Sequence, residues 1–291
     1  MEIVLADYRD FSSFYESMNE FESHKRITQI SIILEFIILA VSIVIASSWL
    51  LGSPLFYSDS GPVMSVFTAL SLLVLSAVRL TGRFLFGWPL PLTFAMLVMV
   101  MGGNLTSIIL VSTLPPEFSR AFDLVFTSVA TSFGLTLYCI YELFTKLRKT
   151  PQNVFIFDDI LLHLALLPVA MGLLAHVFDK PFYTGNSADP RIGTIFLELF
   201  LMGLFAVNAV LSNQNLFIWR LLSSTWSNRI AFLILIFNQF AVPFIVGWYF
   251  QGLEGFGLEV YVMLANGIAV ILFLMIQAYM HYYQNETNLS L

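Results

Sequence analysis

Charged side chains are scarce in this chain of 291 residues, in which Asp, Glu, Lys and Arg together make up 11%. Apolar residues make up 58%, and the mean hydropathy is +0.83. Soluble globular domains carry roughly 25% charged residues, so this composition excludes an ordinary water-soluble fold. Since the apolar runs reach the ~20 residues that a helix needs to cross a bilayer, we expect a polytopic membrane protein.

Basic residues and cysteine are scarce as well. The 13 Lys and Arg are outnumbered by 19 Asp and Glu, and they are scattered rather than gathered in a stripe, which excludes nucleic acid as a partner. The single cysteine, Cys139, lies inside an apolar run, so no disulfide framework is expected. Residues 1–26 are acidic and amphipathic, unlike a signal peptide.

The motifs of several familiar chemistries are missing. None of the apolar runs carries the central lysine of a retinal site, and no Cys cluster or His grouping has the spacing of metal or haem ligands. The segment "MGGNLTS" lacks the Gly-Lys-Ser/Thr of a phosphate-binding loop. No Ser/His/Asp set stands in a convincing context. We therefore expect no enzyme, no catalytic residue, no metal and no cofactor.

The apolar runs predict an all-α fold with eight membrane-spanning helices. The runs are continuous rather than alternating, which disfavours the strands of a β-barrel. The second run is short at its C-terminal end, where we expect Arg79 to snorkel toward the headgroups. The predicted spans are Ile27–Leu51, Val63–Val78, Leu90–Leu114, Ala121–Phe144, Val154–Phe178, Ile192–Leu211, Ile230–Phe250 and Leu258–Tyr279.

The basic residues predict the orientation of these spans. In the eight-span arrangement ten of them fall on one side and three on the other, so the positive-inside rule puts both termini in the cytoplasm. We expect a multi-pass protein of the cell membrane, most simply a bacterial inner membrane. The ten are Arg9, Lys25, Arg26, Arg79, Arg83, Lys146, Arg148, Lys149, Arg220 and Arg229, and the three are Arg120, Lys180 and Arg191.

Two segments outside the spans have helical patterns of their own. Within residues 1–26 apolar side chains recur every three or four positions, opposite an acidic face. Because membrane-surface helices usually carry basic residues on that face, docking against the protein's own cytoplasmic surface or against a partner is favoured. Asn215–Trp226 predicts a short interfacial helix. The apolar stripe is Leu5, Tyr8, Phe11, Phe14, Met18 and Phe21.

The chain contains two similar stretches, "SPLFYSDSGPVMSVFTALSLLVL" from Ser53 and "DKPFYTGNSADPRIGTIFLELFLM" from Asp179. Their alignment predicts two copies of a four-helix unit, 27–150 and 151–284, followed by a cytoplasmic tail at 285–291. Since each unit has an even number of spans, the copies would be parallel repeats about an axis along the bilayer normal. Chance matching of apolar runs is the alternative.

Ionisable residues inside the spans are the first candidates for a site, because each costs about 2.5–3.5 kcal/mol to insert. Glu35 lies about 12 Å into the first span, on one face with Ser31 and Ser42. His163 lies at a similar depth in the fifth span, with Asp159 one turn earlier. The repeat would bring Glu35 and His163 together as a proton-responsive pair. Alternatively, each is hydrogen-bonded separately within the bundle.

Two further sets of polar residues are candidates. Glu198 and His176 fall in the outer half, where they would bind a small polar ligand or form a structural ion pair or solvated rim. A set of amides lies near helix-weakening Gly and Pro residues, as in broken helices that line a site. Hydrogen bonding between helices explains the amides more simply, and we favour it. The amides are Asn104, Asn238, Gln239 and Asn266.

The segment Met64–Leu75, "MSVFTALSLLVL", follows a helix and a short polar outer loop. In this it resembles the multi-span N-terminal sensor regions of bacterial histidine kinases and diguanylate cyclases, the MASE-like class, although Val66 stands where those regions often have proline. The resemblance implies a sensory role. No effector domain follows the final "HYYQNETNLSL", so either a separate kinase or cyclase delivers the output or the likeness is one of architecture alone.

These features leave three functions open. The first is a sensory module that detects a small ligand, a lipid or a proton-linked signal and passes it to a cytoplasmic or membrane partner, with a homodimer as a further option. The second is a transporter or ion-conducting protein with Glu35, His163 and Glu198 along its pathway. The third is a non-catalytic structural subunit of a larger membrane complex.

Overall fold

The computed structural model is helical throughout the residues that it describes, and no strand occurs among them. These residues are 2–53, 55, 64–84, 90–113, 127–148, 156–178, 195–213, 215–223, 225–250 and 258–289. The helices are α1 (Glu2–Leu50), α2 (Val66–Phe84), α3 (Leu90–Thr113), α5 (Val129–Leu147), α6 (Ile156–Val177), α8 (Phe196–Ser212), α9 (Phe217–Ser223), α10 (Trp226–Tyr249) and α11 (Leu258–Leu289).

The helical prediction is confirmed, and each predicted span overlaps a helix. Five segments are long and apolar enough to cross a membrane: Lys25–Leu50, Leu90–Leu110, Ile156–Val177, Trp226–Tyr249 and Leu258–Met280. The described parts of α2 and α8 include shorter apolar stretches, Val66–Gly82 and Phe196–Ser212. The short helix predicted after Asn215 is α9. The structure is therefore that of a helical, multi-pass membrane protein, and the number of eight crossings stays a prediction.

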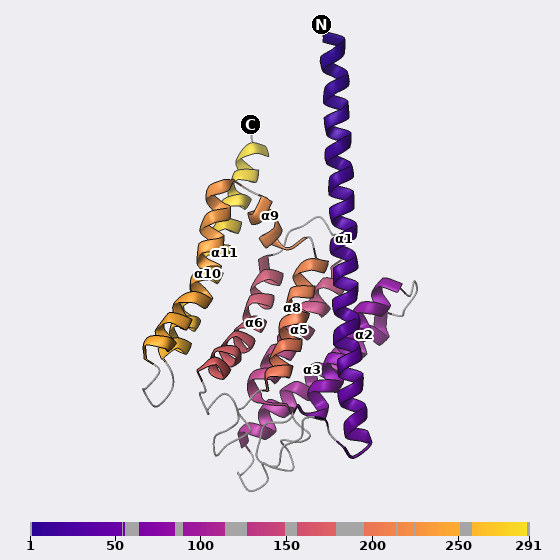
Figure 1. The fold of residues 1–291 in the computed structure, drawn as a ribbon, viewed down its shortest axis with the longest axis vertical. Coiled ribbons are helices and arrows are strands. Elements are labelled where there is room, and N and C mark those ends of the chain that lie inside the picture. The colour runs from indigo at the N-terminus through magenta and orange to yellow at the C-terminus, as the bar shows by residue number, and fades with distance from the viewer. Residues whose placement is uncertain are drawn as a thin grey trace.

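Helix α1 joins two segments that the sequence analysis treated separately. The amphipathic segment 1–26 and the first span form one continuous helix of 49 residues, Glu2–Leu50. The helix ends in a Schellman motif, in which Gly52 has a positive φ of 69° and the N–H of Ser53 bonds back to the carbonyl of Ser48. The N-terminal half of α1 projects beyond the other helices, on the side toward which α11 also extends (Figure 1).

The bundle is built around α2, α5 and α8. Helix α8 packs against α1, α6 and α5, while α2 packs against α1, α3 and α5. The α10–α11 pair lies at the periphery and is attached through α11 to α6 (Figure 1). Leu72, Leu135, Tyr138 and Phe205 of the central helices are fully buried. Apolar side chains of the peripheral pair are instead exposed, for example Phe237 at 70%, as expected of a lipid-facing surface.

The repeat stays a prediction. Its most similar residues, among them Pro54, Tyr57, Pro62, Pro181 and Pro190, lie outside the described residues. In both predicted copies the first helix packs against the second and the third against the fourth. Helices joined by a short connection pack together in most folds, so this pairing does not distinguish a repeat from a chance similarity.

Candidate functional site: a buried ion network

Arg79 is buried inside the bundle, and the prediction that it snorkels to the headgroups is wrong. Helix α2 continues six residues past the predicted end of the span at Val78, and Arg79 is only 7% exposed. It remains inside because neighbouring helices supply acidic partners there, and a buried charge with partners has no need to reach water.

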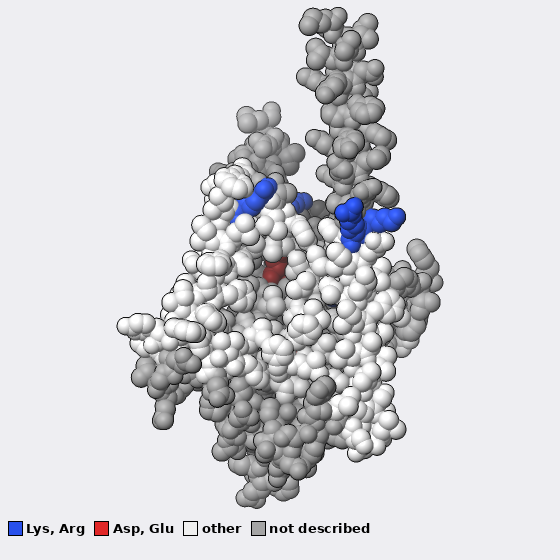
Figure 2. All heavy atoms as spheres, in the orientation of Figure 1, with Lys and Arg blue, Asp and Glu red and all other residues white. Residues whose placement is uncertain are grey.

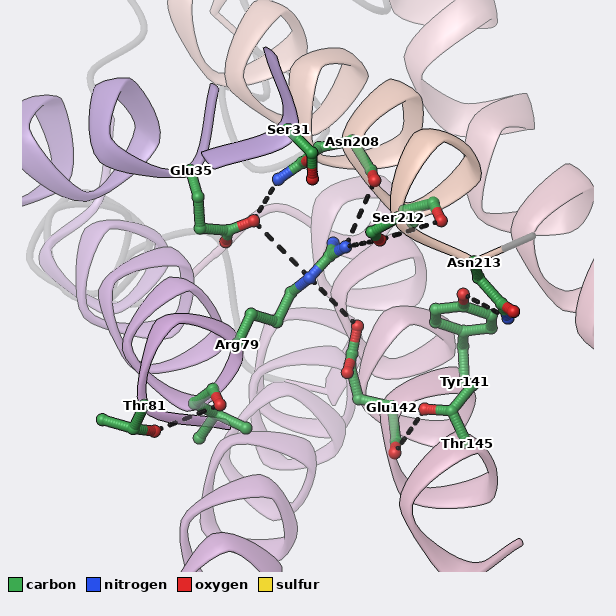
Figure 3. Close-up of polar contacts among 12 residues, drawn as sticks. Ser31, Glu35, Arg79, Thr81, Tyr141, Glu142, Thr145, Asn208, Ser212 and Asn213 are labelled. Atoms are coloured by element: carbon green, nitrogen blue, oxygen red, sulfur yellow. Dashed lines mark hydrogen bonds and ion pairs between the residues drawn. The ribbon is translucent and has the colours of Figure 1, made fainter. Parts of the chain in front are cut away.

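Arg79 lies between two carboxylates on different helices (Figure 3). Its Nε is 3.5 Å from Oε2 of Glu35 on α1 and 3.4 Å from Oε1 of Glu142 on α5. Its Nη2 donates to the backbone carbonyl of Asn208 and to the hydroxyl of Ser212, both on α8. The guanidinium therefore lies at nearly the same distance from both carboxylates.

Asn208 connects α8 to the carboxylate on α1. Its amide nitrogen donates to Oε2 of Glu35, and its amide oxygen accepts a hydrogen bond from Ser31. Ser31, Glu35 and Asn208 are all fully buried, and so is Ser42, which confirms the polar face that the sequence predicts on the first span. The ion network, defined here as Glu35, Arg79, Glu142 and Asn208, joins α1, α2, α5 and α8.

The guanidinium also packs on an aromatic ring. The central carbon of the Arg79 guanidinium lies 4.8 Å from the ring centroid of Phe205, within the range of a cation–π interaction. Phe205 in turn packs against Tyr138, with ring centroids 4.9 Å apart. Both rings are fully buried in the apolar core beside the network.

A cavity of about 280 Å³ borders the network. Arg79 and Glu142 line it together with Lys146, Asn213 and other polar residues at the ends of α5 and α8. The network thus contacts both a closed apolar interior and a polar cavity.

The structure places Glu35 and His163 in different clusters, so the predicted pair is not formed. His163 of α6 lies against Gln239 of α10, with 3.3 Å between the two side-chain nitrogens. Helix α1 packs on α2 and α8, whereas α6 packs on α5, α8 and α11. The sequence predicts the same depth in the membrane for both residues. Their helices pack against different neighbours, however, and this keeps the two side chains apart.

Asp159 has a structural role in this arrangement. Its two carboxylate oxygens accept the backbone N–H groups of Phe217 and Ile218, at 2.8 and 3.0 Å. These are the first residues of α9, whose N–H groups have no partner inside the helix. Asp159 therefore fixes the start of α9 against α6.

Glu198 is surrounded by hydroxyl groups. It is 3% exposed and accepts a hydrogen bond of 3.2 Å from Thr68, with further bonds from Thr131 and from the backbone of Ile195. The ring of His176 packs edge-on against Phe196, with centroids 6.3 Å apart. Glu198 and His176 thus lie at the same end of the bundle, in different immediate surroundings.

The amides connect neighbouring helices, as the favoured interpretation holds. The amide nitrogen of Asn104 donates to Ser71 and so joins α3 to α2. That of Asn266 donates to the backbone carbonyl of Asn238 and joins α11 to α10. Gln239, through His163, joins α10 to α6.

Arg79, Glu142 and Asn208 were not among the predicted site residues. Glu142 is the third residue from the end of the fourth predicted span, whose last residue is Phe144, and Arg79 falls one residue after the end of the second. Opposite charges at the same end of neighbouring spans are the signal that could have found the pair. Among the described residues, no group of three or more His, Cys, Asp and Glu could hold a metal ion.

No protein-family model, curated protein or solved structure matches this chain. The fold and the site define the class as an all-helical protein with several helices fit to cross a membrane and an ion network buried among them. The resemblance to the MASE-like class stays a prediction.

Proposed function

We propose that this protein is an integral membrane signal-transduction module in which the ion network controls the position of α1. The observation that carries the proposal is the continuity of α1, because one helix bears Glu35 inside the network and extends to Glu2 outside the bundle. Residues 2–24 would extend about 35 Å at 1.5 Å per residue. A change at Glu35 can thus be transmitted along a single rigid element.

The mechanism rests on the two partners of Arg79. A signal that strengthens the Arg79–Glu142 ion pair weakens the Arg79–Glu35 ion pair. A signal with the opposite effect strengthens the Arg79–Glu35 pair. Since Arg79 lies at nearly the same distance from both carboxylates, a small differential interaction would suffice to shift the balance. Movements of about 1–2 Å between packed helices are typical of such transitions.

In this proposal the chain crosses a bacterial inner membrane eight times, in two parallel four-helix repeats, with both termini in the cytoplasm. The N-terminal part of α1 then reaches a separate cytoplasmic partner, a kinase or cyclase as the family resemblance implies. The positive-inside pattern supports this orientation.

A distance measurement between spin labels tests the proposal. Labels on Gln29→Cys in α1 and Ser227→Cys in α10 occupy exposed positions, and Cys139 is fully buried and needs no replacement. Glu142→Gln removes one of the two carboxylates with little change of shape. In lipid nanodiscs we expect this variant to shift the mean distance between the labels by about 2 Å.

Glu259→Gln is the matched control, because Glu259 is also buried, at 3% exposure, but lies in the first turn of α11 outside the network. It should leave the distance unchanged. Identical distance distributions in the wild-type protein and in Glu142→Gln would refute the coupling between the network and α1.

One observation favours transport as a second candidate. A second polar cluster, around Glu198, includes Thr68 and Thr131 and therefore lies on the same central helices, α2, α5 and α8. The buried Tyr138–Phe205 ring pair belongs to two of these helices and would act as a closed gate between the clusters. Proton or ion flux in proteoliposomes distinguishes the two functions, since a signalling module needs none.

A further inference from the structure

The cavity beside the network combines several hydrogen-bond donors with little negative charge. Its volume is about 280 Å³, and its lining includes Arg79, Tyr141, Glu142, Lys146, Arg148 and Asn213. Three of these residues are cationic and one is acidic. Arg148 donates two hydrogen bonds of 2.9 Å to Asp158. Arg79 and Lys146 are therefore the two cations of the lining that can bind an anionic ligand.

Arg79 has a donor that the network does not use. Its Nη1 is buried and has no hydrogen-bond partner in the part of the chain that the structure describes. A buried guanidinium N–H without a partner costs about 1–3 kcal/mol or more. Arg79 lines the cavity, so an acceptor that enters beside the guanidinium, with a small rotation of that group, would take this hydrogen bond and recover that free energy.

Lys146 lies next to the same stretch of α2. A Cβ atom added at Gly82, one turn after Arg79, would be 2.6 Å from the Nζ of Lys146. The absence of a side chain at Gly82 therefore makes room for the ammonium group over α2. Lys146 forms no salt bridge with any residue in the described ranges. The positive charge of Lys146 can therefore pair with an anionic ligand in the cavity.

Tyr141 supplies a third donor. Its hydroxyl oxygen accepts a hydrogen bond of 3.0 Å from the amide of Asn213, which leaves its own O–H for another acceptor. Donors from a guanidinium, an ammonium and a phenol suit a tetrahedral oxyanion, whose several oxygens accept from different directions. Lys146 lies in the last turn of α5, at the membrane boundary where lipid phosphates lie in the proposed orientation.

We propose that this cavity binds a phosphate group, either of free inorganic phosphate or of the phosphomonoester headgroup of a lipid. The inference rests on the proposed function, because it names the ligand class of the module. A phosphate on Nη1 of Arg79 and on Lys146 competes with Glu35 and Glu142 for the guanidinium. Phosphate binding thereby weakens the ion pair between Arg79 and Glu35 of α1.

Phosphate binding to the full chain in phosphatidylcholine nanodiscs tests the proposal. We expect saturable binding of inorganic phosphate, and a rise in the unfolding temperature that chloride at equal ionic strength does not reproduce. Lys146→Gln should weaken binding about tenfold, the effect of one lost charged hydrogen bond. Tyr141→Phe is a second variant, with a smaller expected loss. Lys25→Gln is the matched control, since Lys25 is exposed on α1.

A second arm identifies the source of the phosphate. Nanodiscs that contain phosphatidic acid should stabilise the wild-type protein and not Lys146→Gln if the ligand is a lipid headgroup. An effect of free phosphate alone assigns the site to the soluble ion. No effect from either source, or equal losses in Lys146→Gln and Lys25→Gln, overturns the proposal and leaves a cavity filled with water.

The outcome is separable from that of the proposed function. If phosphate binds but the Gln29–Ser227 label distance does not respond to Glu142→Gln, the site stands and the signalling role fails. If that distance responds to Glu142→Gln while phosphate does not bind, the signalling role stands and the ligand assignment fails.

Discussion

At the scale of single residues, Arg79 and its two carboxylates contribute unequally to stability. Replacing Arg79 with Met leaves Glu35 and Glu142 buried together without a counter-charge. Breaking a buried ion pair in this way costs about 3–5 kcal/mol. Glu35→Gln leaves the pair of Arg79 and Glu142 intact and keeps an acceptor for Asn208, so its cost should be about 1–2 kcal/mol.

Equilibrium unfolding in detergent micelles measures this order. Glu259→Gln serves again as the control for a buried glutamate outside the network, with an expected cost below that of Arg79→Met. A Glu35→Gln variant as unstable as Arg79→Met would show that Arg79 depends mainly on Glu35 and that the balance between its partners does not exist.

The residue scale also shows what the sequence could and could not predict. Glu35 and the serines on its face were predicted because an acid in an apolar run is conspicuous in the sequence. The partner of Glu35 was not, because Arg79 lies where an apolar run ends, and arginines there commonly snorkel. Whether Arg79 snorkels or is buried beside an acidic partner depends on which helices are its neighbours. The sequence of a single span does not contain that information.

At the scale of helices, two adjacent glycines of α3 differ in their surroundings. A Cβ atom on Gly103 would overlap the ring of Phe67 on α2, whereas one on Gly102 would meet nothing within 4 Å. Gly103→Ala should therefore displace the ring of Phe67 or push α3 from α2, at a cost of about 1–3 kcal/mol. Gly102→Ala should be neutral or stabilising by up to about 1 kcal/mol, since alanine favours the helix.

Thermal unfolding of the two variants, side by side, tests this contact. Because the pair differs by one position in one helix, effects on helix propensity cancel and the difference reports the approach of α3 to α2. Equal midpoints for Gly102→Ala and Gly103→Ala would contradict a tight contact between Gly103 and the ring of Phe67.

Helices were well predicted from the sequence, and their ends less so. Long apolar runs are sufficient to identify helices in a membrane, because lipid leaves backbone groups no other partners. The runs mark where side chains are apolar, however, and not where the backbone ceases to be helical. Helix α2 therefore continues to Phe84, past the predicted end at Val78, and the helix predicted in residues 1–26 runs without a break into the first span as α1.

At the scale of the whole molecule, the arrangement of helices was not predictable. Apolar side chains face both the lipid and the protein interior, so hydrophobicity does not separate the two. Phe205 and Phe237 are alike in the sequence, yet the first is fully buried and the second is 70% exposed. Small and polar residues show which face of a helix contacts another helix, but they do not show which helix that is.

The same scale decides the topology, which the distribution of charge predicts. The Lys and Arg side chains visible in Figure 2 lie toward the end from which α1 and α11 project, as the positive-inside rule requires if that end is cytoplasmic. In the proposed arrangement α2, α3, α5, α6 and α8 cross the membrane between Ser53 and Ser227. Five crossings put these two exposed residues on opposite sides.

Cysteine labelling in cells tests whether the number of crossings between Ser53 and Ser227 is odd or even. Ser53→Cys should react with a membrane-impermeant maleimide added to spheroplasts, whereas Ser227→Cys should react only after permeabilisation. The native Cys139 is fully buried and should give little background. Labelling of both positions from the same side would mean an even number of crossings between them. One of the shorter apolar helices, α2 or α8, would then fail to span, and Lys25 and Arg220 could no longer share the cytoplasmic side on which signalling through α1 depends.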